Sequence, residues 1–145
     1  MIKKTIIGIY GTANVGKSMT LSSLGRQYVS IGASTHDDVS KGDYRAVLEH
    51  LNHKIGIQSF GDLEKFVKEG LDVFLNSQCD LIYIASKNYG KTRDCIGSFA
   101  RKYGFRVIWI APFEVRDRSM PSKIIKDECA KHLLLMGNNI IAGRL

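Results

Sequence analysis

Residues 5–24 read TIIGIYGTANVGKSMTLSSL, and this stretch decides the fold. β-Branched residues dominate its opening, as expected of a strand that is buried on both faces. Gly11 and Gly16 bracket a short loop, and beyond Lys17 the apolar residues recur at roughly helical spacing until Gly32 stops the pattern. We therefore predict a strand over residues 3–10, a glycine-rich turn, and a helix over residues 17–31.

The rest of the chain alternates between strand and helix patterns. Strands are predicted over residues 47–51, 54–60, 80–85 and 106–111, and helices over residues 61–78, 92–103 and 121–136. The polar segment 33–43 is predicted to be a loop, with a short strand as an alternative. Gly137 follows the last helix as a stop. Because Asn52-His53 lacks the glycine of a favoured hairpin turn, a helix over residues 44–51 remains an alternative. The alternation predicts an α/β fold of three αβα layers around a mostly parallel five-stranded sheet.

Length and composition favour one globular domain over residues 1–145. The chain is 44% apolar and 24% charged, which is ordinary for a soluble protein. No apolar run approaches the about 20 residues of a membrane helix, so no membrane partner is expected. The three cysteines are an odd number without a C-x-x-C pair, which disfavours a disulfide framework or a zinc site. A reducing, cytoplasmic location is expected.

The chain is basic, with 21 Lys and Arg against 14 Asp and Glu, a net charge of +7. Such a charge permits nucleic-acid binding but does not require it, and a solvated basic surface that also suits phosphate ligands is the favoured interpretation. No nucleic-acid-binding motif accompanies it, so nucleic acid is a possible partner but not the favoured one.

Residues 11–18, GTANVGKS, match the pattern G-x-x-x-x-G-K-[ST] without a mismatch. In such a loop the backbone N–H groups curl around a phosphate, which the glycines allow to come close. Lys17 would bring a charge to the β- and γ-phosphates, and Ser18 a hydroxyl to Mg²⁺. The predicted nucleotide-binding residues are Gly11, Thr12, Ala13, Asn14, Val15, Gly16, Lys17, Ser18 and Met19.

On these residues the stretch from about 5 to 24 resembles the P-loop NTPase superfamily. The resemblance implies binding of ATP or GTP with Mg²⁺ and chemistry at the γ-phosphate. The string NVGKS at residues 14–18 is similar to the loop of translation-associated GTPases, but neither D-x-x-G nor N-K-x-D occurs at the matching places. The size and strand pattern are closer to the small P-loop kinases.

Kinases of that kind need a carboxylate near the acceptor hydroxyl and a cation near the transferred phosphoryl group. Asp37 or Asp38, after the first helix, is the candidate base, although both also suit a solvated turn. Arg93, in the basic segment 87–93, is the candidate cation, unless that segment is only an exposed loop capped by Thr92. Asp62 is the candidate second ligand of Mg²⁺, unless it only favours the start of the next helix.

The sequence thus predicts an ATP-binding enzyme that transfers the γ-phosphoryl group to a small acceptor, in the manner of a nucleoside or nucleotide kinase. The acceptor itself is not indicated. The alternative is a nucleotide-dependent switch or regulatory ATPase or GTPase that has no small-molecule acceptor.

Overall fold

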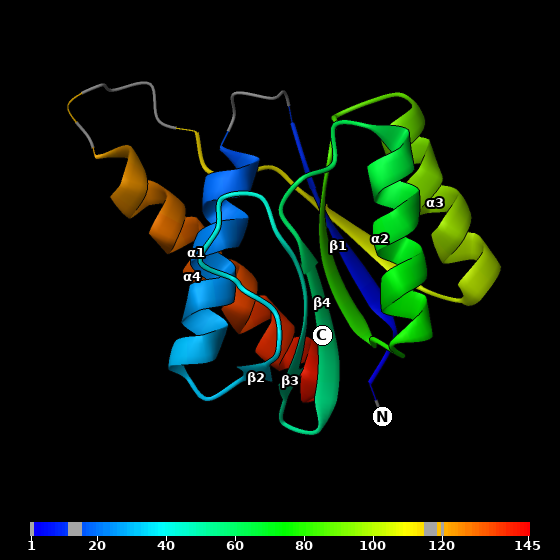
Figure 1. Ribbon diagram of the computed structural model, residues 1–145, viewed down its shortest axis with the longest axis horizontal. Helices are drawn as coiled ribbons and strands as arrows, with labels where there is room; N and C mark the ends of the chain where they lie inside the picture. The colour runs from blue at the N-terminus through cyan, green and yellow to red at the C-terminus, as the bar shows by residue number, and fades with distance from the viewer. Residues whose placement is uncertain (1, 12–15, 115–118, 120) are drawn as a thin grey trace.

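The computed structural model describes residues 2–11, 16–114, 119 and 121–145. These residues form an α/β structure with a mixed sheet and helices on both of its faces (Figure 1). The strands are β1 (Thr5–Tyr10), β2 (Ser34–Thr35), β3 (Arg45–His50), β4 (His53–Gln58), β5 (Leu81–Ser86) and β6 (Arg106–Ile110). The helices are α1 (Lys17–Ser30), α2 (Glu64–Asn76), α3 (Lys91–Tyr103) and α4 (Ser122–Ile141).

The sheet has six strands in the order β2-β3-β4-β5-β1-β6. Strands β4, β5, β1 and β6 run parallel, whereas β3 is antiparallel to both β4 and β2. The prediction of five strands was therefore wrong, because a two-residue strand such as β2 leaves no periodic pattern in the sequence. β2 lies in the segment 33–43, where a short strand was the alternative to a loop. The sheet is mixed because so short a connection between β3 and β4 permits only antiparallel pairing.

The turn between β3 and β4 lies one residue earlier than predicted. Leu51 and Asn52 carry it, with φ angles of 51° and 65°. Two consecutive residues with positive φ are the mark of the hairpin turn whose twist matches that of the strands, and asparagine tolerates this conformation well. The alternative helix over residues 44–51 is wrong, since β3 occupies this segment.

Helices cover the two faces of the sheet in pairs. Helices α1 and α4 pack on the face that contains Ile7 and Ile9, while α2 and α3 pack on the face of Ile6. Successive residues of β1 point to opposite faces, so both faces of this strand are buried. Its carboxyl end, between those of β5 and β6, is where open α/β sheets bind ligands. None of the four helices described has the length and apolar content that crossing a membrane requires.

Helix α4 is longer than the sequence predicted, because Gly137 lies inside it rather than beyond its end. A Cβ at Gly137 would overlap the hydroxyl groups of Tyr28 and Tyr83. These hydroxyls lie 2.8 Å apart, and that of Tyr83 donates to the Leu133 carbonyl oxygen at 2.8 Å. Burial raises the pKa of Tyr28 to about 12, so the pair stays neutral. The glycine is therefore required for close packing.

We expect Gly137→Ala to lower the free energy of unfolding by about 1–2 kcal/mol, because the added methyl group overpacks the two tyrosine hydroxyls. The matched control is Gly97→Ala in α3, where the nearest atom to an added Cβ is Arg101 Nη1 at 3.5 Å. This control should gain up to about 1 kcal/mol from helix propensity. Urea unfolding of both variants measures the difference, and equal stability would contradict the packing argument.

Candidate functional site

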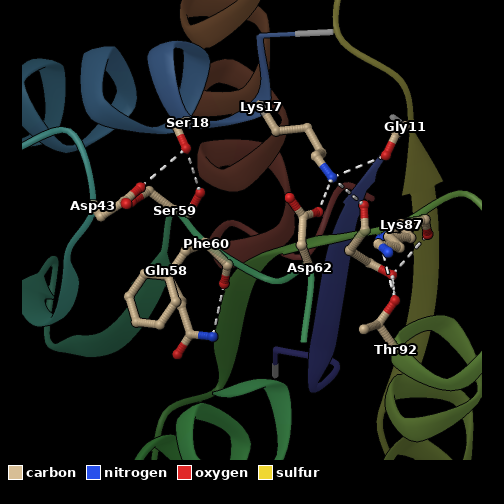
Figure 2. A network of polar contacts seen from close by, with 11 residues as sticks. Gly11, Lys17, Ser18, Asp43, Gln58, Ser59, Phe60, Asp62, Lys87 and Thr92 are labelled. Carbon is tan, nitrogen blue, oxygen red and sulfur yellow. Dashed lines mark hydrogen bonds and ion pairs between the residues drawn. The ribbon is translucent and has the colours of Figure 1, made fainter. Parts of the chain in front are cut away.

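Lys17 is the centre of the polar contacts at the carboxyl edge of the sheet (Figure 2). It opens α1, directly after Gly16, whose φ of 91° is in the left-handed region. Its Nζ donates to the carbonyl oxygens of Gly11 and Ser86, both at 2.9 Å, and lies 2.7 Å from Asp62 Oδ1. All three ammonium protons have acceptors. Lys17 therefore links the ends of β1 and β5 to the loop after β4.

Asp62 supplies the countercharge of this lysine. The Lys17 side chain is only 5% exposed, whereas that of Asp62 is 44% exposed. A buried ammonium group without an anion is unfavourable, and Asp62 provides one while keeping access to solvent. The sequence predicted Asp62 as a metal ligand; the structure shows it next to the loop lysine.

The loop that carries this carboxylate is fixed in two ways. Gln58, fully buried at the end of β4, donates from its side-chain amide to the carbonyl oxygens of Phe60 at 2.9 Å and Phe66 at 3.0 Å. The backbone of Gly61 packs so closely on the Ala85 carbonyl that a Cβ there would overlap it. Residues 59–63 are thereby held against the end of β5.

Ser18 has a second carboxylate beside it, which the sequence analysis missed. Its Oγ donates to the Ser59 carbonyl oxygen at 3.0 Å and lies 3.2 Å from Asp43 Oδ1 (Figure 2). Asp43 belongs to the irregular segment before β3, in which the sequence predicts Asp37 and Asp38 as site residues instead. No pattern in the sequence distinguishes Asp43, because only tertiary contacts bring it to α1.

Hydrogen bonds fix the segment that carries Asp43. The buried Ser59 hydroxyl accepts from the Tyr44 N–H and donates to the Gly42 carbonyl oxygen, both at 2.8 Å. Ser22 of α1 donates to the same carbonyl at 3.0 Å, and the Tyr44 hydroxyl donates to the Leu21 carbonyl oxygen at 2.5 Å. The segment is thus tied both to α1 and to the end of β4.

These groups surround one cavity of about 640 Å³. Part of its wall is polar and charged, and part is apolar. The lining residues are Lys17, Ser18, Asp43, Ser59, Phe60, Gly61, Asp62, Leu63 and Phe66. Three residues predicted from the sequence, Lys17, Ser18 and Asp62, therefore meet in one place.

The two predicted base candidates do not line this cavity. Asp37 accepts a hydrogen bond from the Val47 N–H at 2.9 Å and lines a separate cavity of about 400 Å³ beside β2. Asp38 is exposed, and hydrogen bonds from the Ser40 hydroxyl and N–H hold its pKa below the usual range. The Asp37 carboxylate thus binds the backbone of β3 and that of Asp38 stabilises a local turn, so the geometry gives a catalytic role of either residue no support.

Arg93 does not line the cavity either. Its guanidinium carbon lies 4.2 Å from the ring centroid of Trp109 and 4.9 Å from that of Tyr10, a favourable cation–π arrangement. Its Nη1 donates to the Asn88 carbonyl oxygen at 2.9 Å. Thr92 accepts from the Lys87 N–H at 3.1 Å, so it organises the loop after β5 rather than capping α3.

The remaining predicted binding residues belong to the loop itself. Gly11 and Gly16 have the positive φ angles, 147° and 91°, that favour glycine. Met19 is 46% exposed on α1 and does not line the cavity. Thr12, Ala13, Asn14 and Val15 lie outside the described residues.

The oxygen atoms at the cavity are of the kind that Mg²⁺ prefers. Ser18 offers a hydroxyl, and Asp43 and Asp62 offer carboxylates. No group of three or more His, Cys, Asp or Glu that could hold a metal occurs in the part of the chain that is described. Mg²⁺ commonly uses one or two carboxylates together with water and substrate phosphates. These residues fit a Mg²⁺ that arrives with a phosphate ligand, and do not form a closed protein site.

We expect Ser59→Ala to lower the free energy of unfolding by about 1–3 kcal/mol, because it leaves the buried Tyr44 N–H without its acceptor. It should also speed amide hydrogen exchange over residues 41–44. Ser40→Ala is the control, since Ser40 is exposed and its loss should change stability by less than about 0.5 kcal/mol. Equal stability of the two variants would show that Ser59 does not fix the Asp43 segment.

Similarity to known proteins does not identify this site. The chain matches no protein-family model, no curated protein and no solved structure. The indications of function lie in the chemistry of the cavity, where a buried ammonium, a hydroxyl and two carboxylates meet at one edge of the sheet.

Proposed function

We propose that this protein is a P-loop NTPase that binds ATP or GTP with Mg²⁺ and hydrolyses the bond between the β- and γ-phosphates of the nucleotide. The observation that carries the proposal is the joint placement of Lys17, Ser18, Asp43 and Asp62 around one cavity (Figure 2). The match to the motif adds support, since a buried strand leads into it and a helix leads out of it.

The phosphate chain would bind at the start of α1. The first N–H groups of a helix lack intrahelical acceptors and carry the positive end of its dipole. The first turn of α1 contains no acidic side chain that would compete with a phosphate. The Lys17 ammonium lies in the same place, and its bond to Asp62 is one that a phosphate oxygen can replace. Lys17 would then leave Asp62 for the ligand.

This exchange would free Asp62 for a second task. Together with Ser18 and Asp43 it would hold Mg²⁺ through oxygen atoms, directly or through water. When bound, Mg²⁺ would neutralise charge on the β- and γ-phosphate oxygens as it builds up during transfer. The two loops that carry Asp43 and Asp62 would both change contacts with nucleotide occupancy, which suits a switch or regulatory NTPase.

Transfer to a small acceptor is the second candidate, and the apolar wall of the cavity favours it. Phe60, Leu63 and Phe66 could pack against the body of an acceptor while its hydroxyl faces the carboxylates. The absence of Asp37 and Asp38 from that cavity weighs against it. Incubation with ATP, Mg²⁺ and nucleosides separates the two: inorganic phosphate alone means hydrolysis, and a phosphorylated nucleoside means transfer.

We expect ATP–Mg²⁺ or GTP–Mg²⁺, at about 100 times its Kd, to raise the melting temperature of the wild type by roughly 5–10 °C. Lys17→Ala should abolish this rise, because it removes the buried cation at the phosphate site. Lys131→Ala, which removes a cation from the exposed face of α4, should keep it. When ATP and GTP are compared at one equal concentration, the nucleotide that gives the larger rise is the one bound more tightly, which reveals the base preference. Equal rises in the wild type and Lys17→Ala would remove the proposal.

Asp62→Asn should change nucleotide affinity in opposite directions with and without Mg²⁺. In EDTA, affinity should rise severalfold, because Lys17 no longer has a competing anion and a negative charge near the phosphates is gone. With Mg²⁺, affinity should fall below that of the wild type, since a metal ligand is lost. The control Asp94→Asn removes an equal charge from the groove between α2 and α3 and should change neither value. A change of the same sign in both conditions would refute the dual role of Asp62.

A further inference from the structure

A second lysine lies against the start of α1, far from Lys17 in the sequence. Lys126, on α4, is only 8% exposed. Its side chain fills the space beside Gly16: a Cβ built there would overlap Lys126 Cε and would lie 2.9 Å from Nζ. One donor of the ammonium goes to the Phe113 carbonyl oxygen, at 2.6 Å. A buried positive charge is therefore next to the glycine that precedes the phosphate-binding lysine.

The position of Lys126 is fixed by the packing of α4 on α1. The neighbouring Asp127 accepts a hydrogen bond from Ser23 Oγ at 2.6 Å, and its backbone carbonyl accepts from Gln27 Nε2 at 3.0 Å. The Ser23 bond also lowers the pKa of the Asp127 carboxyl group, which keeps it charged. Because both partners lie on α1, the α4 residues beside them cannot drift along this helix. The Lys126 ammonium is held in place before any ligand arrives.

The charges around the start of α1 favour the binding of an anion. The helix dipole is positive there, and the first turn of α1 has no acidic side chain. Lys17 approaches from the sheet, with Asp62 as its counterion. Lys126 approaches from α4 and adds a second buried ammonium to the same end of the helix. Two ammonium groups and the helix dipole thus lie at the start of α1, with Asp62 beside Lys17 and Asp43 beside Ser18 as the carboxylates nearby. A polyanion can contact more of these positive groups than a single phosphate can.

We propose that Lys126 is a second phosphate-binding lysine, through which α4 contacts the polyphosphate chain of the nucleotide. This inference rests on the proposed nucleotide function of the same site. Affinity should therefore depend on the number of phosphates in the ligand, because one lysine on each of two helices contacts the same polyphosphate. This contact also links nucleotide occupancy to the segment after β6, since the Lys126 ammonium that binds phosphate also donates to the Phe113 carbonyl oxygen.

The test compares the affinity of variants for inorganic triphosphate, ATP and AMP by calorimetry. Lys126→Gln is the main variant, because it removes the charge but keeps N–H donors for the Phe113 carbonyl. It should weaken triphosphate and ATP binding about ten-fold, as expected for loss of a charged hydrogen bond, and AMP binding less. Lys126→Met, a second uncharged variant, should give the same loss. Lys131→Met, an exposed control on the same helix, should bind as the wild type does.

The outcomes separate the inference from the function on which it rests. Suppose that the wild type binds triphosphate, that Lys17→Ala abolishes this binding, and that both Lys126 variants bind triphosphate with the affinity of the wild type. The inference is then wrong and the proposed function stands. A lower melting temperature of the Lys126 variants with unchanged triphosphate affinity also overturns the inference, because it shows a purely structural lysine. If the wild type binds neither triphosphate nor ATP, the proposed function itself fails.

Discussion

The buried ammonium group of Lys17 is the constraint on which the rest of the site depends. Its three protons need acceptors, and these come from Gly11 after β1, Ser86 at the end of β5 and Asp62 after β4. Only the parallel arrangement of these strands brings their carboxyl ends to one edge of the sheet. The order of the strands therefore determines whether the Lys17 ammonium has its hydrogen-bond acceptors. Lys17 stabilises the structure and is also a candidate phosphate-binding residue.

A second set of hydrogen bonds holds two loops next to Lys17 and the start of α1. Gln58 is the last residue of β4 and Ser59 follows it; Gln58 fixes the loop of Asp62 and Ser59 fixes the segment of Asp43. Ser18 contacts both the Ser59 carbonyl and Asp43, so the first turn of α1 contacts each loop. A ligand that draws Lys17 and Ser18 toward itself must change the hydrogen bonds of both loops. This coupling follows from shared acceptors and does not require any large motion.

The parts of the fold that sequence predicted are those that local pattern determines. The first strand and the helix that follows it are close in the sequence, and each has a local pattern. Asp62 follows a strand, so strand direction alone brings it to the edge with Lys17. Asp43 was missed because hydrogen bonds from Ser22 and Ser59, distant in the sequence, place it. The predicted end of the last helix at Gly137 was wrong because this glycine is required for packing, and the tyrosines that pack against it lie on other elements. The sequence around Lys126 is that of an ordinary solvated helix, so it does not predict that this lysine is buried.

The positive and negative charges of the site lie on different elements. Positive charge gathers at the start of α1, from the helix dipole, Lys17 and Lys126, while the two loops contribute the carboxylates Asp43 and Asp62. A phosphate chain with a divalent cation on its far side has the complementary order, with its anionic part toward the helix and its cation toward the loops. A simple anion would complement only the helix side, and a metal ion alone only the loops. The distribution therefore favours a ligand that carries both charges, and among biological phosphates a magnesium-bound nucleoside triphosphate has that form.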